Sequence, residues 1–156
     1  MSDKSLCFAP RNIFEKILEY AVVPTFDLIV QCGDSGVILL RRKIAPYKGV
    51  WALPGLRMMK PEGIDDTLTR IALQETGIRI DPKKRRFIGQ YVGRFRSEHQ
   101  RQDLSTCYAV SCDAPEVRIN PAHFSGHCFI RAKQEIPQNT GAMYRYFLEL
   151  YFKNKN

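Results

Sequence analysis

The sequence has few features that would divide the chain or place it in a membrane. Its 156 residues contain no internal repeat, no low-complexity tract and no run approaching the roughly 20 apolar residues that span a bilayer. The first ten residues, MSDKSLCFAP, lack the charged and apolar regions of a signal peptide. We therefore expect a single globular domain over residues 1–156, located in the cytoplasm and making no membrane contact.

Cysteine is sparse, and its spacing indicates neither disulfides nor zinc. The chain has five cysteines, an odd number, and no two of them have the short paired spacing of a zinc site. They are Cys7, Cys32, Cys107, Cys112 and Cys128. We expect reduced thiols, most of them buried.

Acidic residues are outnumbered by basic ones. The chain has 16 acidic and 24 basic residues and a formal net charge of +8, which favours an anionic partner. The densest basic run, residues 83–86, follows a predicted helix and is interpreted as a solvated turn. No stacking or base-reading motif accompanies the charge, so we expect a nucleotide substrate and no nucleic acid.

Apolar patterning predicts a mixed α/β (α+β) fold, with a sheet flanked by helices. The segment 11–20, RNIFEKILEY, has the spacing of an amphipathic helix. Strands at 26–30 and 37–40 form a predicted hairpin, and a short strand at 50–53 ends at a Pro-Gly pair. A helix capped by Asp65 or Asp66 continues to Thr76 and ends at Gly77. Further strands are predicted at 86–92, 107–112 and 127–131, and a closing helix at about 141–152.

Glu75 is the first candidate functional residue, because it falls on the apolar face of its helix. At about 100° per residue, Glu75 lies within about 60° of Leu68, Ile71 and Ala72. An ionised carboxylate buried there needs a cation or hydrogen bonds, unless it sits at a frayed, hydrated helix end.

The segment before this helix contains groups suited to a metal and a diphosphate. The turn at 53–55, Leu-Pro-Gly, exposes backbone carbonyls that can join a carboxylate around a hard ion such as Mg²⁺. Arg57 and Arg70 flank the same segment and can hold phosphate oxygens. Together these residues indicate a diphosphate and metal site.

These residues resemble the Nudix hydrolase box, which runs Gly, five residues, Glu, seven residues, then Arg-Glu-U-x-Glu-Glu-x-Gly-U, where U is a bulky aliphatic residue. The positions in register are Glu62, Arg70, Glu75, Gly77 and Ile78. The departures are Leu56 at the box glycine, Ile71 at the first helical Glu and Gln74 at the second. Only one of the usual helical carboxylates is therefore present.

The missing acids resemble those of the GDP-mannose mannosyl hydrolase branch, which uses one Mg²⁺. The resemblance covers roughly residues 14 to 110 and includes residues 26–30, Trp51, the Pro-Gly pair at 54–55 and residues 106–108. It implies a Nudix-like mixed sheet and hydrolysis of a nucleoside diphosphate sugar to GDP and free sugar. In that branch water attacks the anomeric carbon, whereas most Nudix enzymes direct water to phosphorus.

The resemblance also implies a role for each matched residue. Gly55 and Glu75 would bind Mg²⁺, for which Mn²⁺ can substitute, and Arg42 would stabilise the departing GDP. Substrate contacts would come from the remaining matched residues, Asp27, Arg57, Arg70 and Tyr108. The branch and the helix at 11–20 are also compatible with a homodimer.

The general base is left open by the sequence. Alignment of the strand at Phe129 places Phe124 on the histidine of the branch, and a shift of one residue in the loop would restore His123 as the base. His127 is the second candidate and His99 the third. Histidine suits the task because its unperturbed pKa lies near neutrality.

Two other functions remain open. A pyrophosphohydrolase acting on a nucleoside triphosphate or nucleoside diphosphate derivative would use Glu62 and Glu75, with Glu98 or Asp103 as a further ligand. A non-catalytic nucleotide-binding module would keep the fold without turnover. Identification of the bond that is cleaved separates these hypotheses.

Overall fold

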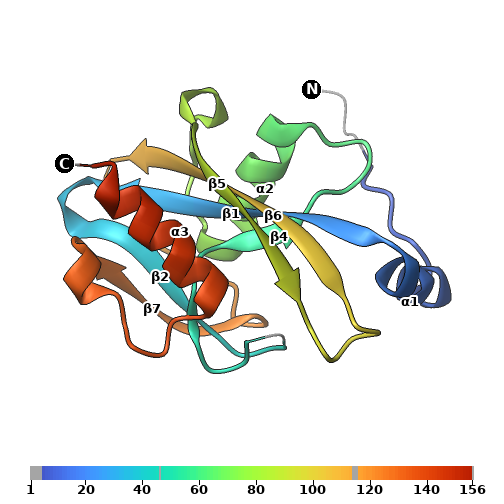
Figure 1. Ribbon diagram of the computed structural model, residues 1–156. Helices are drawn as coiled ribbons and strands as arrows, with labels where there is room; N and C mark the ends of the chain where they lie inside the picture. The colour runs from blue at the N-terminus through green and yellow to red at the C-terminus, as the bar shows by residue number, and fades with distance from the viewer. Residues whose placement is uncertain (1–4, 46, 114–115, 156) are drawn as a thin grey trace.

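The computed structural model describes residues 5–45, 47–113 and 116–155. Its centre is a mixed sheet in the order β3-β2-β1-β6-β5, in which β4 also pairs with β1 and β7 with β2 (Figure 1). The strands are β1 (Val22–Cys32), β2 (Gly36–Arg42), β3 (Trp51–Ala52), β4 (Gly55–Arg57), β5 (Arg86–Arg94), β6 (Gln102–Cys112) and β7 (Phe124–Ile130). Three short 3₁₀ turns are η1 (Gly33–Ser35), η2 (Pro82–Lys84) and η3 (Lys133–Glu135). The mixed α+β architecture matches the prediction.

The two longest strands run parallel at the middle of the sheet. β1 pairs with β6 in parallel from Val22 opposite Gln102 to Cys32 opposite Cys112. The predicted hairpin is present, since β1 turns through η1 into antiparallel β2. The short strand predicted at 50–53 is β3, which ends before the Pro-Gly pair as predicted, and Gly55 then opens a further strand, β4, antiparallel to β1. A second strand is thereby laid beside Asp27.

Helices α2 (Ile64–Thr76) and α3 (Ala142–Lys153) cover opposite faces of the sheet (Figure 1). Side chains along a strand alternate between the two faces, so β1 contributes to both. Leu28 packs with Leu68 and Ile71 of α2. Ile29 belongs to the cluster that contains Phe147 of α3. Both faces of the sheet are therefore apolar and covered.

Helix α2 differs from the prediction at its start. Its N-cap residue is Gly63 rather than Asp65 or Asp66, and Asp66 Oδ2 accepts the Gly63 N–H at 2.9 Å. Gly77 closes the helix with a left-handed φ of 69°, as the sequence predicts, and its N–H donates to the Leu73 carbonyl at 3.0 Å.

Helix α1 (Arg11–Tyr20) occupies the range that the apolar spacing predicts. It lies at one end of the sheet, beside the start of β1 (Figure 1). Leu18 is buried, whereas Ile13 and Ile17 are partly exposed. Within the described residues, no helix is long and apolar enough to cross a membrane.

Candidate active site

A cavity of about 440 Å³ is lined by residues from the start of α3, from β4, from α1 and from the end of α2. It gathers six of the eight residues to which the sequence analysis gives a role. These are Asp27, Arg42, Gly55, Arg57, Glu75 and His123. Arg70 and Tyr108 do not line the cavity.

Glu75 reaches this cavity from the last turn of α2 and is 1% exposed. Its Oε1 and Oε2 atoms lie 3.0 and 3.3 Å from Nδ1 of His123. Burial raises the pKa of Glu75, while hydrogen bonds from His123 and Asn120 lower it. The partner of this carboxylate is thus a histidine 48 residues away, the same one that the sequence analysis singles out as a candidate base.

Asn120 holds the loop that carries His123, and the sequence analysis missed it. Its N–H donates to the Glu75 carbonyl at 3.2 Å, and its own carbonyl accepts the N–H groups of His123 and Phe124 at 3.1 and 2.9 Å. Its side-chain oxygen accepts the Ala122 N–H at 3.0 Å. An asparagine followed by proline is a turn signal, which was the only mark of this residue in the sequence.

Asp27 is a buried carboxylate, 3% exposed, in the central strand β1. Ser105 donates its hydroxyl proton to Oδ2 of Asp27. Burial raises the pKa of Asp27 to about 7, although Ser105 and the positive charge of Arg42 oppose this shift. Asp27 is therefore a buried acid on the cavity wall with a pKa near neutrality.

Residue 55 must be glycine because it pairs with Asp27 where β4 runs beside β1. A Cβ atom at residue 55 would lie 2.3 Å from Oδ1 of Asp27 and 2.9 Å from the carbonyl oxygen of Phe26. Glycine therefore lets the backbone of β4 approach the Asp27 carboxylate closely.

Arg42 extends from the end of β2 into the same cavity. Its charge acts on Asp27, Glu75 and Tyr144, and it hydrogen-bonds the Tyr144 side chain. Its Nη2 atom also donates to the Ala45 carbonyl at 3.4 Å. The positive charge of Arg42 therefore acts on both carboxylates.

Arg57 and Arg101 also line the cavity. The Arg57 guanidinium lies 4.0 Å from the centre of the Phe14 ring on α1. Burial lowers the pKa of Arg57, and the like charges of Arg101 and Arg70 lower it further. Arg101 forms ion pairs with Asp103 at 2.7 Å and Glu98 at 3.3 Å.

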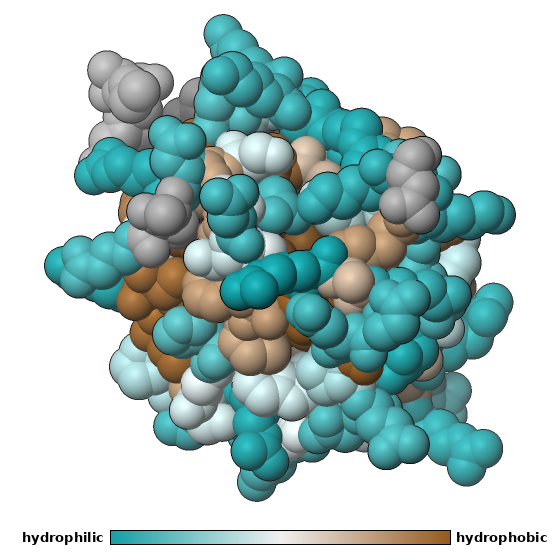
Figure 2. Space-filling view, turned by 90° about the vertical axis from the view of Figure 1, so that its left-hand side faces the viewer, coloured by the Kyte–Doolittle hydropathy of each residue, from teal (hydrophilic) through white to brown (hydrophobic). Residues whose placement is uncertain are grey.

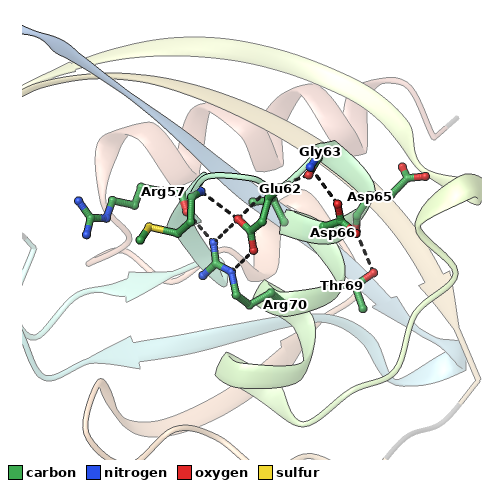
Figure 3. Close-up of polar contacts among 9 residues, drawn as sticks. Arg57, Glu62, Gly63, Asp65, Asp66, Thr69 and Arg70 are labelled. Carbon is green, nitrogen blue, oxygen red and sulfur yellow. Dashed lines mark hydrogen bonds and ion pairs between the residues drawn. The ribbon is translucent and has the colours of Figure 1, made fainter. Parts of the chain in front are cut away.

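Arg70 faces Glu62 rather than the cavity (Figure 3). Its Nε atom donates to Glu62 Oε1, and its Nη2 atom donates to Oε2 at 2.9 Å and to the Arg57 carbonyl at 2.7 Å. Burial raises the pKa of Glu62, but the Arg70 hydrogen bond and the Met59 N–H lower it more. Arg70 and Glu62 therefore fasten the start of α2 to β4, which carries Gly55 and Arg57.

Tyr108 lies on the other face of the sheet, toward α2. Its ring stacks 6.2 Å from Phe26 and meets Phe87 edge-on at 5.9 Å. The Arg85 guanidinium lies 5.4 Å from the ring centre. These surroundings are those of a packing residue at the edge of the core.

The other histidines lie away from the cavity. His127 is exposed on β7, with its ring 5.7 Å from Phe129. His99 is exposed in the turn between β5 and β6, where its φ is 61°. Among the described histidines, His123 alone lines the cavity with Glu75.

The donor set of the cavity fits one hard cation. Within the described ranges, no three His, Cys, Asp or Glu side chains form a cluster that could hold a metal. Glu75 and Gly55 both line the cavity, where a carboxylate and a backbone carbonyl would be the protein's oxygen donors, and a diphosphate would supply the oxygens that complete the coordination of Mg²⁺. The residues present therefore suit a metal shared with its substrate rather than a site closed by protein ligands.

Comparisons with known proteins agree with this fold. The chain is 25% identical over 131 residues to the low-salt glycan biosynthesis protein Agl8 of Haloferax volcanii, covering 78% of this chain and 80% of that protein. A MutT NUDIX hydrolase from Burkholderia pseudomallei superimposes with a TM-score of 0.72 at 19% identity, covering 82% of this chain and 96% of that one. The NUDIX domain of Shewanella oneidensis NrtR, complexed with ADP ribose, gives a TM-score of 0.71 at 17% identity, covering 95% and 94%.

The family assignment rests on a direct sequence match. The model of the NUDIX domain matches residues 23–150, which include all seven strands apart from the first residue of β1, and α3 as far as Leu150. Helix α1 precedes the matched segment, although its Phe14 lines the cavity. The chain belongs to the NUDIX domain family.

Proposed function

We propose that this protein is a Mg²⁺-dependent hydrolase of nucleoside diphosphate sugars. As in the GDP-mannose mannosyl hydrolase branch, it would release GDP and free sugar. The observation that carries the proposal is the pairing of Glu75 with His123 inside the cavity that also contains Arg42 and Gly55. The cavity thus holds one carboxylate from the altered box, one histidine and one guanidinium. This set fits a reaction in which a single metal and the guanidinium stabilise a departing diphosphate.

His123 would act as the general base. Its Nδ1 atom faces Glu75, so a proton on Nδ1 leaves the lone pair of Nε2 available to a water molecule. In the proposed step the water oxygen attacks the anomeric carbon, its proton passes to His123, and the bond from that carbon to the diphosphate oxygen breaks. Glu75 fixes the tautomer and orientation of the ring.

Departure of the diphosphate creates negative charge that must be neutralised. Arg42 is held at the cavity by Tyr144 and adds a fixed positive charge for the departing oxygen. Bound Mg²⁺, held by Glu75 and the Gly55 carbonyl, would supply Lewis acidity at the diphosphate. Arg57 also lines the cavity and would add positive charge for the substrate, whereas the charge of Arg101 is balanced by Asp103 and Glu98.

Arg70 and Tyr108 act indirectly in this proposal. Arg70 positions β4 through Glu62 and the Arg57 carbonyl. Tyr108 packs against Phe26, the neighbour of Asp27. Both are therefore positioning residues.

The test is a screen of GDP-mannose, other nucleoside diphosphate sugars, ADP-ribose and nucleoside triphosphates with Mg²⁺ or Mn²⁺, run in H₂¹⁸O. Attack at carbon places the label in the released sugar, and attack at phosphorus places it in a phosphate. We expect labelled sugar and unlabelled nucleoside diphosphate. A labelled nucleoside monophosphate would overturn the proposed bond cleavage.

Two variants test the roles of the site residues. Glu75→Gln and His123→Asn should each lower kcat by about 10²- to 10⁴-fold, the range for a lost general base, with the fold retained. His127→Asn is the matched control, because His127 is exposed and outside the cavity. Equal activity of His123→Asn and His127→Asn would remove His123 from the mechanism.

A pyrophosphohydrolase is the second candidate function, and Asp103 favours it. Asp103 is 7% exposed and lines the same cavity as Glu75, and it would have to leave its ion pair with Arg101 to serve as a further acid. Glu62, the other acid of this hypothesis, is engaged by Arg70. Loss of all turnover in Asp103→Asn, together with a nucleoside monophosphate product, would support this alternative.

A further inference from the structure

A second groove lies along the C-terminal half of α3, apart from the site that contains Glu75. It has a volume of about 800 Å³ and shares no lining residue with the smaller cavity. Its walls come from the end of β7, from η3 and from α3. The lining residues that matter here are Arg131, Lys133, Tyr146, Leu150, Lys153 and Lys155.

The groove concentrates positive charge. Arg131, Lys133, Lys153 and Lys155 all line it, and no described carboxylate lies within ion-pair distance of these four side chains. Glu149 is the one acidic residue on the wall. Figure 2 shows the side where α3 ends, and hydrophilic side chains spread over that face with apolar atoms between them. Clustered positive charges without a carboxylate partner favour a bound anion, although Lys155 Nζ also donates to Gln31 Oε1 at 3.1 Å.

The helix dipole explains only part of this cluster. A lysine in the last turn, such as Lys153, interacts favourably with the C-terminal end of α3. Arg131 and Lys133 belong to other segments and face the same groove. The positive surface continues onto β5, because Arg86 and Lys155 each lie 5.5 Å from the Tyr151 ring.

Apolar and aromatic groups accompany the charge. Tyr146 is 41% exposed, and its ring packs at 5.5 Å on Tyr91, which fixes its position. Leu150 and Phe152 line the groove as well. Grooves that combine cations with exposed aromatic rings suit single-stranded nucleic acid, whose phosphates follow the charge and whose bases stack. A flat bilayer surface would fit a concave groove poorly.

We propose that this groove binds the phosphate backbone of single-stranded nucleic acid, with Tyr146 as a stacking surface. The site is separate from the proposed hydrolytic centre, so it does not depend on which bond that centre cleaves. No nucleic acid was expected from the sequence, because no stacking or base-reading motif accompanies its positive charge.

The test is fluorescence anisotropy of a labelled 12-nucleotide poly-U RNA with the full chain, from 50 to 200 mM NaCl. The variant Lys133→Glu/Lys153→Glu should weaken binding at least tenfold at 50 mM NaCl. Loss of two phosphate contacts should also reduce the slope of log affinity against log salt by about 1.4. Tyr146→Ser should weaken binding with an unchanged salt slope.

The matched control is Lys83→Glu/Lys84→Glu, which makes the same change in net charge at two exposed residues of η2. We expect less than a twofold change in its affinity. Equal losses of RNA affinity in the two double variants would show that only net charge matters and would overturn the proposal. Absence of RNA binding by the parent at 50 mM NaCl would overturn it as well.

Further arms separate the alternatives. Melting curves check that each variant folds, and Lys133→Gln/Lys153→Gln repeats the test with a milder change. Glu75→Gln should bind RNA as the parent does, whereas loss of RNA binding in this variant would assign the RNA to the Glu75 cavity. Tighter binding to phosphatidylserine vesicles than to RNA, with the same dependence on Lys133 and Lys153, would assign the groove to membranes instead.

Discussion

The contact between Gly55 and Asp27 makes a quantitative prediction about stability. In Gly55→Ala the new Cβ would lie 2.3 Å from Oδ1 of Asp27 and 2.9 Å from the Phe26 carbonyl oxygen. The first of these atoms can move only by displacing a buried carboxylate that Ser105 holds. The second is backbone in the central strand. Alanine is therefore too large for residue 55.

The expected cost follows from overpacking of a well-ordered region. Forcing a methyl group into such a site costs about 1 to 3 kcal/mol. At about 2 to 4 °C per kcal/mol for a domain of this size, a loss of about 2 kcal/mol lowers Tm by about 4 to 8 °C. Urea unfolding and calorimetry measure both quantities.

Gly126→Ala is the matched control on β7. No atom lies within 4 Å of the Cβ that alanine would add there, so this change should leave stability within about 0.5 kcal/mol. The double variant Asp27→Ala/Gly55→Ala should lose less than the sum of its single variants, because the carboxylate no longer meets the methyl group. Additive losses, or equal stability of Gly55→Ala and Gly126→Ala, would refute the contact.

Three further predictions follow from the same region. Because burial raises the folded-state pKa of Asp27 to about 7 from an ordinary value of 3.8, its protonation stabilises the fold below about pH 4, and this contribution is lost as pH rises to about 7. The free energy of unfolding of the parent, measured with urea, should therefore fall relative to that of Asp27→Asn by up to about 1.4 kcal/mol per pH unit between pH 5 and 7. The same pH dependence of this free energy in both proteins would contradict the shift. Arg70→Ala should cost about 3 kcal/mol because it leaves Glu62 buried without its cation, whereas Arg118→Ala, which removes an ion pair that is 76% exposed on both sides, should cost less than about 1 kcal/mol. If Mg²⁺ binds at Glu75, saturating Mg²⁺ with a non-hydrolysable diphosphate analogue should raise the Tm of the parent and leave that of Glu75→Gln unchanged, and equal shifts would exclude this residue as the ligand.

Local sequence determined the elements whose signals lie within a few residues. Gly77 ends α2 because a left-handed φ of 69° suits glycine, and the apolar spacing of RNIFEKILEY matches the bounds of α1. The periodicity of α2 also directs Glu75 toward the core, where the structure places it. The start of α2 was predicted less well, since Gly63 caps the helix and Asp66 reaches back to it.

Only the tertiary structure decided which partners these residues have. The sequence could not distinguish a phosphate ligand from a structural arginine at residue 70, because the carbonyl of Arg57 that it binds is brought near by the pairing of β4 with β1. It could not show that Tyr108 faces α2 rather than the cavity, since that depends on the register of β6.

Glu75 shows the division most clearly. Its place on the apolar face of α2 follows from a period of 3.6 residues and was already evident in the sequence. The identity of its partner, His123, depends on a loop held by Asn120 at the Glu75 carbonyl. Helical periodicity is a local property of the chain, whereas a contact across 48 residues exists only after the sheet and its loops have assembled.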